Sequence, residues 1–289
     1  MLTGRTRAAG VIGSPIRHSL SPTIFNAAFE AAGLDWAYLA FEVPEGSAGS
    51  AMTGVRALGL EGLSVTMPHK AAVIDELEGL SDAAAALGAV NCITNRGGVL
   101  HGDNTDGDGF VDALTLGEGI EVVGARCAIV GAGGAGRAVA RSLGEAGAAS
   151  IVIINRTQAA AERAAALAGP RARIGTADDV QTADLVVNAT SLGMGVVVST
   201  SGGPEPLPID VARLGPGQVV VDLVYHPAVT PLLAEARRQG LRTVNGLGML
   251  IHQAAHAFRL WTNEDPPLEA MSAAAVADLA IRHVPPEIH

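Results

Sequence analysis

The sequence contains almost no lysine. Of its nineteen Lys plus Arg residues only one is a lysine, Lys70. A guanidinium stays charged in proteins, whereas the pKa of a lysine shifts readily with its surroundings, so a lysine suits proton transfer and an arginine does not. The scarcity of lysine elsewhere makes Lys70 a candidate catalytic residue. The alternative is the chance survival of one lysine in an arginine-rich composition.

The chain also lacks basic tracts and long apolar runs. Its formal net charge is −10, which argues against nucleic acid or an anionic membrane as a partner. No apolar run reaches membrane-spanning length, and the arginines of the first ten residues precede no apolar core of a signal peptide. Cys92 and Cys127 lack metal-ligand spacing. We therefore expect buried, reduced thiols and a cytoplasmic protein.

Aromatic residues are scarce as well, at 3 % of the chain, although 48 % of the residues are hydrophobic. A core made mostly of alanine and valine is typical of helices that pack closely on sheets. The 289 residues are too many for one ordinary core and suit two domains.

The first third of the sequence alternates apolar strands with helical stretches. We predict strands at 8–12, 37–43 and 63–66, and helices at 22–32 and 47–58. Pro68 follows the third strand and is tolerated in the first turn of a helix, which predicts that Lys70 lies in that opening turn. Ligands of open α/β sheets bind near such strand ends.

A second alternating block begins near Arg126. It predicts a parallel sheet with right-handed crossovers, with strands at 127–130, 151–154, 185–188, 219–223 and 241–244 and helices at 136–145, 157–167 and 231–239. Residues 249–282 are predicted to be helical throughout. The Gly- and Pro-rich segment 195–208 is predicted to be a mobile loop.

A glycine-rich turn, Gly131-Ala-Gly-Gly-Ala-Gly136, follows a strand and opens a helix. Such glycines permit a tight turn and let backbone N–H groups reach a pyrophosphate at a helix N-terminus. In this context the turn predicts a dinucleotide site, with a plain tight turn as the alternative.

The end of the next strand indicates which dinucleotide is bound. An NAD site usually carries an Asp or Glu there for the ribose 2′-hydroxyl, but this strand ends in Asn155-Arg156-Thr157. Arg156 is suited to a 2′-phosphate, with the two neutral residues as hydrogen-bond partners. We therefore expect NADP, the alternative being that Arg156 is only a solvated surface residue.

Three further segments carry many polar groups. In Ser14–Pro22 two serines flank a helix start, where hydroxyls and N–H groups favour a carboxylate. Ser21 alone could cap that helix, but Ser19 is not needed for a cap. The second segment is Val65–Lys70, and the third combines residues 88–91 with 102–107.

Asp103 and Asp106 in the third segment each have three possible roles: metal ligand, helix cap or catalytic partner. The sequence offers no second acidic cluster nearby, which makes a metal the weakest of these.

In order, these motifs resemble one family, the shikimate dehydrogenases, over essentially the whole chain. The resemblance rests on residues 14–22, 64–70, 88–91, 102–107, 131–136, 155–157, 188–190, 224–225 and 245–253. It implies an α/β fold of two domains: a substrate domain at 1–106, a Rossmann-type doubly wound NADP domain at 107–245, and C-terminal helices at 246–289 that pack on the first domain. It also implies reversible, NADPH-dependent reduction of 3-dehydroshikimate to shikimate.

The resemblance further implies roles for individual residues. Lys70 and Asp106 would form the catalytic pair, Ser19 and Ser21 would hold the substrate carboxylate with help from Tyr225, and the ring hydroxyls would be bound by Thr66, Asn91, Asp106 and Gln253. No metal is expected. The implied cofactor-binding residues are Gly131, Ala132, Gly133, Gly134, Ala135, Asn155, Arg156, Thr157, Thr190, Gly246 and Met249.

Some positions depart from the family pattern. Ser64 stands where the family often has Asn, Cys92 where Thr is frequent, and Ala160 where a second arginine is common. Arg163 is the candidate to replace that arginine. The Val196–Val198 run has no evident role. His252 and His256 are spaced i, i+4 but lack a third metal ligand, and His18, His69, His101 and His226 are expected to shape the site rather than act as bases.

Three alternatives stay open. A relative acting on quinate or an aminated shikimate analogue, with NADP or NAD as its cofactor, would keep the catalytic pair. A nucleotide sensor without catalysis would be expected to have lost Lys70 or Asp106. A structural scaffold leaves the glycine turn and polar segments unexplained. A homodimer is possible, since the apolar N-terminal block could offer an edge strand.

Overall fold

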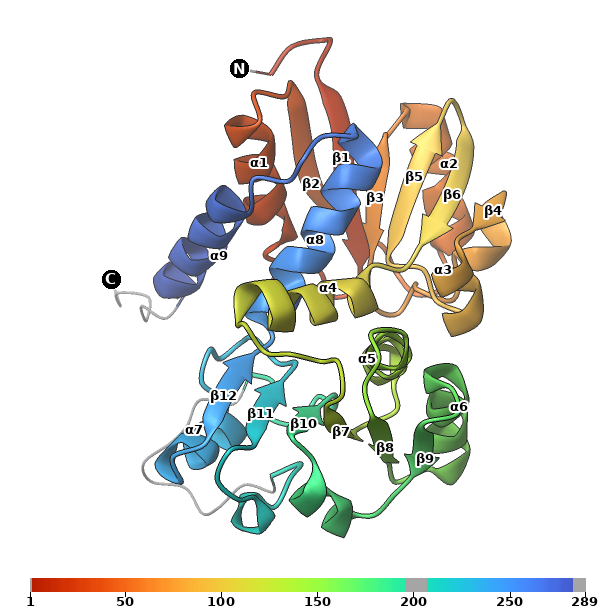
Figure 1. The fold of residues 1–289 in the computed structure, drawn as a ribbon. Coiled ribbons are helices and arrows are strands. Elements are labelled where there is room, and N and C mark those ends of the chain that lie inside the picture. The colour runs from red at the N-terminus through yellow and green to blue at the C-terminus, as the bar shows by residue number, and fades with distance from the viewer. Residues whose placement is uncertain (1, 196–206, 283–289) are drawn as a thin grey trace. The chain divides into compact units, whose positions relative to one another are not determined.

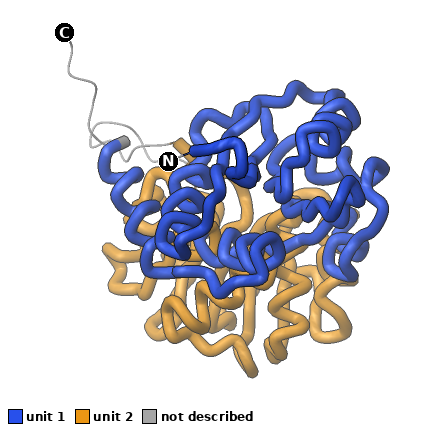
Figure 2. Tube along the Cα trace, turned by 90° about the horizontal axis from the view of Figure 1, so that it is seen from above, with its two compact units in different colours: residues 1–105, 251–289 blue, residues 106–250 orange. Residues whose placement is uncertain are grey.

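The computed structural model describes residues 2–195 and 207–282, and these form two compact units (Figures 1 and 2). The first unit combines residues 1–105 with 251–289, and the second spans residues 106–250. The sequence-based boundaries at 106/107 and 245/246 lie one and five residues from these divisions. The loop expected at 195–208, with its Val196–Val198 run, lies almost entirely outside the described residues.

The first unit is built on a six-stranded mixed sheet with the order β2-β1-β3-β5-β6-β4. β1 runs parallel to β2 and β3, whereas β5 is antiparallel to both β3 and β6. The strands predicted in this unit are confirmed, whereas β4, β5 and β6 were not predicted. The strands are β1 (Arg7–Gly13), β2 (Trp36–Glu42), β3 (Gly62–Val65), β4 (Gly79–Leu80), β5 (Cys92–Arg96) and β6 (Val99–Asp103).

Helices from both ends of the unit's sequence cover this sheet. Near the sheet, α8 crosses the strands and α9 lies beside α1 (Figure 1). The helix pair α1 and α9 is further joined by a hydrogen bond from Thr23 Oγ1 to Asp278, 2.5 Å long. The helices are α1 (Ser21–Ala31), α2 (Ala48–Leu58), α3 (Asp82–Leu87), α8 (Leu247–Thr262, which begins in the second unit) and α9 (Leu268–Arg282).

Aromatic side chains fill the space between α1, α8 and the sheet. The ring of Phe25 lies 4.4 Å from that of Tyr38 and 4.9 Å from that of Trp261. The indole N–H of Trp261 donates to the Ile93 carbonyl of β5 at 3.0 Å. A Cβ at Gly62 would lie 2.4 Å from the same indole, so only glycine lets α8 approach β3 this closely.

The second unit holds a six-stranded sheet with the order β12-β11-β10-β7-β8-β9, in which every pairing is parallel. This is the doubly wound order of a dinucleotide-binding fold, and it confirms the predicted parallel sheet. The strands are β7 (Arg126–Val130), β8 (Ser150–Ile154), β9 (Ala172–Ile174), β10 (Leu185–Asn188), β11 (Val219–Asp222) and β12 (Arg242–Asn245). The short edge strand β9 was not predicted.

The helices of the second unit, except the first, follow its strands, as the crossover pattern requires. They are α4 (Asp106–Asp112), α5 (Gly134–Glu145), α6 (Gln158–Ala168) and α7 (Pro231–Arg238). A π-helical turn at Ala113–Gly117 continues α4. Among all the helices in the described ranges, none has the length and apolarity needed to cross a membrane.

Candidate functional site

The glycine-rich turn lies at the carboxyl end of β7, beside the point where the strand order reverses. Gly131 has a φ of 107°, and a Cβ there would lie 2.9 Å from the Ala189 backbone. A Cβ at Gly136 would lie 2.2 Å from the Gly131 carbonyl oxygen. Both glycines are therefore required by the turn itself and by the close approach of α5.

Gly133 and Gly134 are glycines for a different reason. A Cβ at either position would meet no atom within 4 Å, and no side chain caps α5 at its N-cap, Gly133. The side-chain positions of both glycines thus face open space. Two glycines that packing does not require leave room for a group from outside the chain, and a phosphate fits that position.

Asn155 ties the end of β8 to this turn. Its side-chain oxygen accepts a hydrogen bond from the Ala132 N–H at 3.1 Å, and its amide donates to the Thr157 carbonyl at 2.9 Å. Arg156 and Arg163 are exposed and make no ion pair or hydrogen bond with another described residue. Two uncompensated guanidinium groups at this end of β8 and on α6 suit an anion such as a 2′-phosphate.

Thr190 is positioned by a buried polar network at the ends of β10 and β11. Asn188 Oδ1 accepts hydrogen bonds from the Thr190 N–H at 3.0 Å and its hydroxyl at 2.7 Å. The Asn188 amide donates to Asp222, which also accepts from the Thr230 hydroxyl at 2.6 Å. Burial raises the pKa of Asp222, and hydrogen bonds from Thr230, Val224 and Asn188 oppose that shift. The protein therefore uses both donors of Thr190.

Gly246 and Met249, two further residues implied to bind cofactor, lie at and after the end of β12. A Cβ at Gly246 would lie 1.9 Å from the Leu223 carbonyl oxygen, so backbone packing alone requires this glycine. Met249 is partly buried against the core of the second unit. These contacts give both residues a structural reason for their identity.

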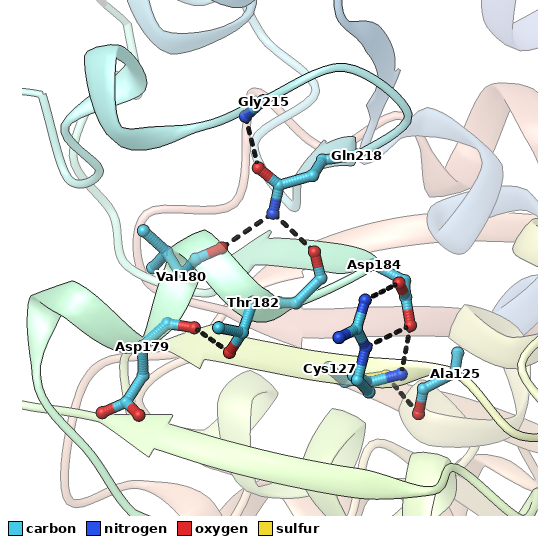
Figure 3. Close-up of polar contacts among 10 residues, drawn as sticks. Ala125, Cys127, Asp179, Val180, Thr182, Asp184, Gly215 and Gln218 are labelled. Carbon is cyan, nitrogen blue, oxygen red and sulfur yellow. Dashed lines mark hydrogen bonds and ion pairs between the residues drawn. The ribbon is translucent and has the colours of Figure 1, made fainter.

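Polar groups at the opposite, amino-terminal edge of the same sheet pair with one another (Figure 3). The buried amide of Gln218 donates to the carbonyls of Val180 at 2.7 Å and Ala183 at 2.5 Å. The Arg126 guanidinium binds both oxygens of Asp184 and lowers the pKa of that carboxyl. These described groups therefore satisfy one another.

In the first unit, backbone hydrogen bonds bring the three polar segments together. The Ser14 N–H donates to the Met67 carbonyl at 3.0 Å, and the Val90 N–H donates to the Lys70 carbonyl at 2.7 Å. A third bond, from the Val65 N–H to the Asn91 carbonyl at 2.8 Å, joins the end of β3 to the start of β5. Segments far apart in sequence thus form one polar region.

The serine motif differs from its sequence-based interpretation. Ser21 does not cap α1: it is the first residue of the helix, Leu20 occupies the N-cap, and no side chain caps it. Instead Ser19 Oγ accepts a hydrogen bond from the Ser21 N–H at 3.2 Å. Ser19 therefore satisfies a helix N–H group, the role that the alternative interpretation gave to Ser21.

Lys70 does not lie in the opening turn of an α-helix, as predicted. Residues 67–73 form consecutive turns that lead into a short 3-10 helix at Ile74–Glu76, and the Met67–Pro68 peptide bond is cis. Neighbouring His69 is buried, with Nε2 2.7 Å from the Val43 carbonyl oxygen. Lys70 itself is half-buried. The buried histidine anchors the turn that carries Lys70.

Asn91 and Gln253 meet in the first unit, although 162 residues separate them. The Asn91 amide donates to Gln253 Oε1 at 3.4 Å and to the Thr105 hydroxyl at 3.0 Å. The Thr105 hydroxyl in turn donates to the Gln253 carbonyl at 3.0 Å. Thr105 therefore joins two expected substrate residues, a role that sequence reasoning missed although Thr105 lies inside the Gly102–Gly107 motif.

The remaining expected site residues occupy defined positions. Thr66 directly follows β3 and is half-buried, and its N–H donates to the Ile12 carbonyl at 3.0 Å. Asp106 is buried as the first residue of α4. Tyr225 follows β11 in the second unit. Expected site residues thus follow the parallel strands β3 and β11, and another opens α4.

Asp103, for which three roles remained open, lies at the end of β6. Burial raises its pKa, while a hydrogen bond from Ser81 acts in the opposite direction. Within the described part of the chain, no group of three or more His, Cys, Asp or Glu side chains could hold a metal ion.

Sequence comparisons agree with this arrangement. Residues 11–93 match the family described as "Shikimate dehydrogenase substrate binding domain", residues 116–206 match "Shikimate / quinate 5-dehydrogenase", and residues 246–276 match "Shikimate 5'-dehydrogenase C-terminal domain". A Geobacter sulfurreducens protein named "Shikimate dehydrogenase (NADP(+))" is 45% identical, over 96% of this chain and 98% of its own length.

Solved structures show the same likeness. Shikimate 5-dehydrogenase from Thermus thermophilus, in complex with NADP(H) and shikimate, superposes with a TM-score of 0.85 at 37% identity, covering 94% of this chain and 99% of that one. Quinate dehydrogenase from Corynebacterium glutamicum, in complex with NAD, gives 0.83 at 32% identity, with the same coverages. With this identity over nearly its full length, the chain belongs to the shikimate dehydrogenase family.

Proposed function

We propose that this protein is an NADP-dependent shikimate dehydrogenase, which reversibly reduces 3-dehydroshikimate to shikimate. The observation that carries the proposal is the match, over nearly the whole chain, to enzymes named for this activity and cofactor. The two free guanidinium groups near the end of β8 and the open space at Gly133 and Gly134 support NADP as the dinucleotide.

The chemistry assigns a task to each expected residue. When bound, NADPH supplies a hydride to the ring carbonyl carbon. Lys70 stabilises the negative charge that develops on the carbonyl oxygen and donates the proton that completes the new hydroxyl. Asp106 orients Lys70 and accepts a hydrogen bond from a neighbouring ring hydroxyl. The lysine is then reprotonated from solvent.

Binding of the substrate falls to the polar region of the first unit, and Tyr225 is a further expected substrate residue. Ser19 and Ser21 hold the carboxylate at the start of α1, where the helix dipole also favours an anion. Thr66, Asn91 and Gln253 bind ring hydroxyls. A site built from such partners rejects analogues that lack a hydroxyl, because its own polar groups would then be buried and unpaired.

For the cofactor, we assign the pyrophosphate to the turn Gly131–Ala135 and the 2′-phosphate to Asn155, Arg156 and Thr157. Arg163 is a second cation for that phosphate in place of the arginine replaced by Ala160. Thr190, Gly246 and Met249 complete the cofactor site. An NAD-using quinate dehydrogenase is the second candidate function, which the likeness to the Corynebacterium enzyme and Ala160 both favour.

The deciding experiment mixes the purified protein with shikimate or quinate and either NADP or NAD, and follows nicotinamide absorbance. We expect rapid reduction of NADP with shikimate, and Lys70→Ala should lose most of this turnover with little change in substrate affinity. Lys70→Arg keeps the charge but cannot transfer the proton, so it should be equally slow. Near-normal turnover in Lys70→Ala would remove this residue from the mechanism.

The same assay separates the cofactors. Arg156→Ala should weaken NADP much more than NAD, because only NADP carries the 2′-phosphate, whereas Arg238→Ala removes a charge on α7 and should leave both unchanged. Faster reduction of NAD with quinate would favour the second candidate. Binding of NADP without turnover of any of these substrates would point to a sensor.

The proposal also covers the cellular location of the protein and its assembly. Cys92 and Cys127 are free and buried, which supports a reducing, cytoplasmic location. A homodimer is proposed through β2, an edge strand of the first sheet. Sedimentation of the purified protein tests this assembly, and a monomer at all concentrations would contradict it.

A further inference from the structure

The buried side chain of Asn188 fixes the direction in which the Thr190 hydroxyl donates. Asn188 Oδ1 accepts a hydrogen bond from the Thr190 N–H at 3.0 Å and another from the Thr190 hydroxyl at 2.7 Å. Because a backbone N–H can only donate, the atom that faces it is the amide oxygen and not the NH2 group. The hydroxyl meets this same oxygen. Its single proton is therefore used inside the protein.

The oxygen of the Thr190 hydroxyl keeps part of its bonding capacity. A hydroxyl has one proton to donate and two lone pairs that accept. The Leu192 N–H donates to one of these lone pairs at 3.3 Å, and the Thr190 side chain is half-buried rather than enclosed. After its contacts with described residues are counted, this hydroxyl can offer a ligand one acceptor position but no donor.

Asp222 holds Asn188 in this direction. Its carboxylate is completely buried, and Oδ1 accepts from the Asn188 amide at 2.9 Å and from the Val224 N–H at 3.1 Å. The other oxygen accepts from the Thr230 hydroxyl at 2.6 Å. Because the Val224 N–H can only donate, Oδ1 is an acceptor, and it attracts the NH2 group of Asn188. The amide oxygen of Asn188 is thereby directed toward Thr190.

Thr190 borders the glycine-rich turn to which we assign the pyrophosphate. β10 pairs with β7, and a Cβ at Gly131 would lie 3.0 Å from Thr190 Cγ2. The phosphate oxygens of a dinucleotide accept hydrogen bonds, so they are poor partners for a group that also accepts. The ribose hydroxyls, the nicotinamide carboxamide and the adenine amine can all donate. The free position of Thr190 suits one of these donors.

We propose that Thr190 binds the dinucleotide as a hydrogen-bond acceptor, so that its partner is an N–H or O–H group of the cofactor, and that Asp222 sets this polarity through Asn188. Asp222 is a positioning residue and touches no cofactor. The inference rests on the proposed function, because it takes Thr190 as a residue of the cofactor site. It adds Asn188 and Asp222 to the residues that determine the affinity for NADP.

Calorimetric titration with NADP tests the role of Thr190 without any turnover. Thr190→Val keeps the shape of the side chain but loses the hydroxyl, so the Kd for NADP should rise about five- to tenfold, the cost of one lost hydrogen bond. Thr190→Ser keeps the hydroxyl and should stay within about twofold of the wild type. An unchanged Kd in Thr190→Val, or an equal rise in Thr190→Ser, would overturn the inference.

The matched control is Asp184→Asn. Asp184 lies next to the other end of β10, where its carboxylate binds Arg126 (Figure 3). This substitution also changes a polar group beside the same strand, but it leaves Asn188 and Thr190 with their partners. Its Kd for NADP should equal that of the wild type. A rise as large as that in Thr190→Val would show a general effect of the strand and would contradict the inference.

Two analogues of NADP identify the donor that Thr190 accepts from. In the acetylpyridine analogue a methyl group replaces the NH2 of the carboxamide, and the hypoxanthine analogue lacks the adenine amine. Thr190→Val should no longer weaken binding of the analogue that lacks the partner of Thr190. An undiminished loss with both analogues would assign the partner to a ribose hydroxyl.

Variants of Asp222 test the route through Asn188. Asp222→Ala should weaken NADP about as much as Thr190→Val does, and should add little to it in the double variant. Asp222→Asn restores an oxygen for the Asn188 amide and should recover most of the affinity. Full additivity, or equal losses in both Asp222 variants, would overturn the positioning role. If Asp222→Ala does not fold, Asn188→Leu removes the same link at similar volume and takes its place.

The wild-type protein is titrated first, with NADP and with NAD. Absence of binding to both would contradict the proposed function itself. Equally tight binding of NADP by the wild type and by Thr190→Val would contradict only the role of Thr190 as an acceptor.

Discussion

The two units fill their cores with different kinds of side chain. Of the five Phe, two Tyr and two Trp residues in the chain, only Phe110 and Tyr225 lie in the second unit. The first unit gathers Phe25, Tyr38 and Trp261 between its helices and a mixed sheet. The core of the second unit is instead filled by alanine, valine, isoleucine and leucine, with Phe110 as the one aromatic side chain in its main cluster.

Small residues let the helices of the second unit approach one another closely. A Cβ at Gly144 on α5 would lie 2.2 Å from the Ala168 carbonyl oxygen at the end of α6. At Gly107 on α4 it would lie 2.0 Å from the Ser142 hydroxyl of α5. The first unit should therefore suffer most when a large side chain is removed, and the second when a small one is enlarged.

The largest expected effect is at Trp261. Trp261→Ala should lower the free energy of unfolding of the first unit by about 3–5 kcal/mol, because it leaves a cavity and an unpaired Ile93 carbonyl. Circular dichroism during urea unfolding measures this loss. Trp261→Phe should cost clearly less. A loss below about 1 kcal/mol for the alanine variant would mean that the aromatic cluster does not hold α8 on the sheet.

A smaller change in the free energy of unfolding is expected at Gly144, and its sign shows whether α5 packs closely there. Replacing a helical glycine with alanine ordinarily stabilises by about 0.5–1 kcal/mol. Gly144→Ala should instead destabilise the second unit by about 1–3 kcal/mol, since the new methyl group meets backbone on α6.

The control for Gly144 is Gly54 on α2. A Cβ there would meet no atom within 4 Å, so Gly54→Ala should show the ordinary gain. Urea unfolding of both variants gives the comparison. Stabilisation by both substitutions would show that α5 and α6 are not closely packed, and would remove the contrast between the units.

The smallest expected effect concerns the rate at which the two native thiols, one in each unit, react with a thiol reagent. Burial raises the pKa of Cys127 to about 12 and that of Cys92 well above its usual range, so neither is a thiolate at pH 8. A thiol reagent should label neither in the native protein and both in urea. Trp261→Ala should speed labelling of Cys92 alone, and Gly144→Ala that of Cys127 alone. Rapid labelling of both in the native protein would contradict the burial of these residues.

The second unit could be predicted well from sequence because its signals are local. Strands β7, β8, β10 and β11 are short apolar runs, and Gly131–Gly136 marks the turn after the first of them. The first unit was harder, since its sheet is mixed. The hairpin of β5 and β6 was missed although Gly97 and Gly98, both with positive φ, form the two-residue turn typical of such a hairpin. That signal was present in the sequence.

Contacts between distant residues account for what the sequence could not show. In the sequence, Tyr38 is an ordinary aromatic residue of a predicted strand. Only the pairing of β2 with β1 and of β1 with β3 brings it near Ser64. Thr105 joins Asn91 to Gln253 across more than half of the chain. The turn that carries Lys70 was taken for a helix because Pro68 is compatible with both. Local patterns do not contain this information.

The return of the chain to the first unit has a consequence for biosynthesis. Residues 106–250 contain every strand of the second sheet and are all translated before Ile251. Phe25 and Tyr38 are translated early, yet their cover, Trp261, leaves the ribosome near the end of synthesis. The second unit can therefore complete its fold on the nascent chain first. Phe25 and Tyr38 therefore lack the cover of Trp261 for most of translation.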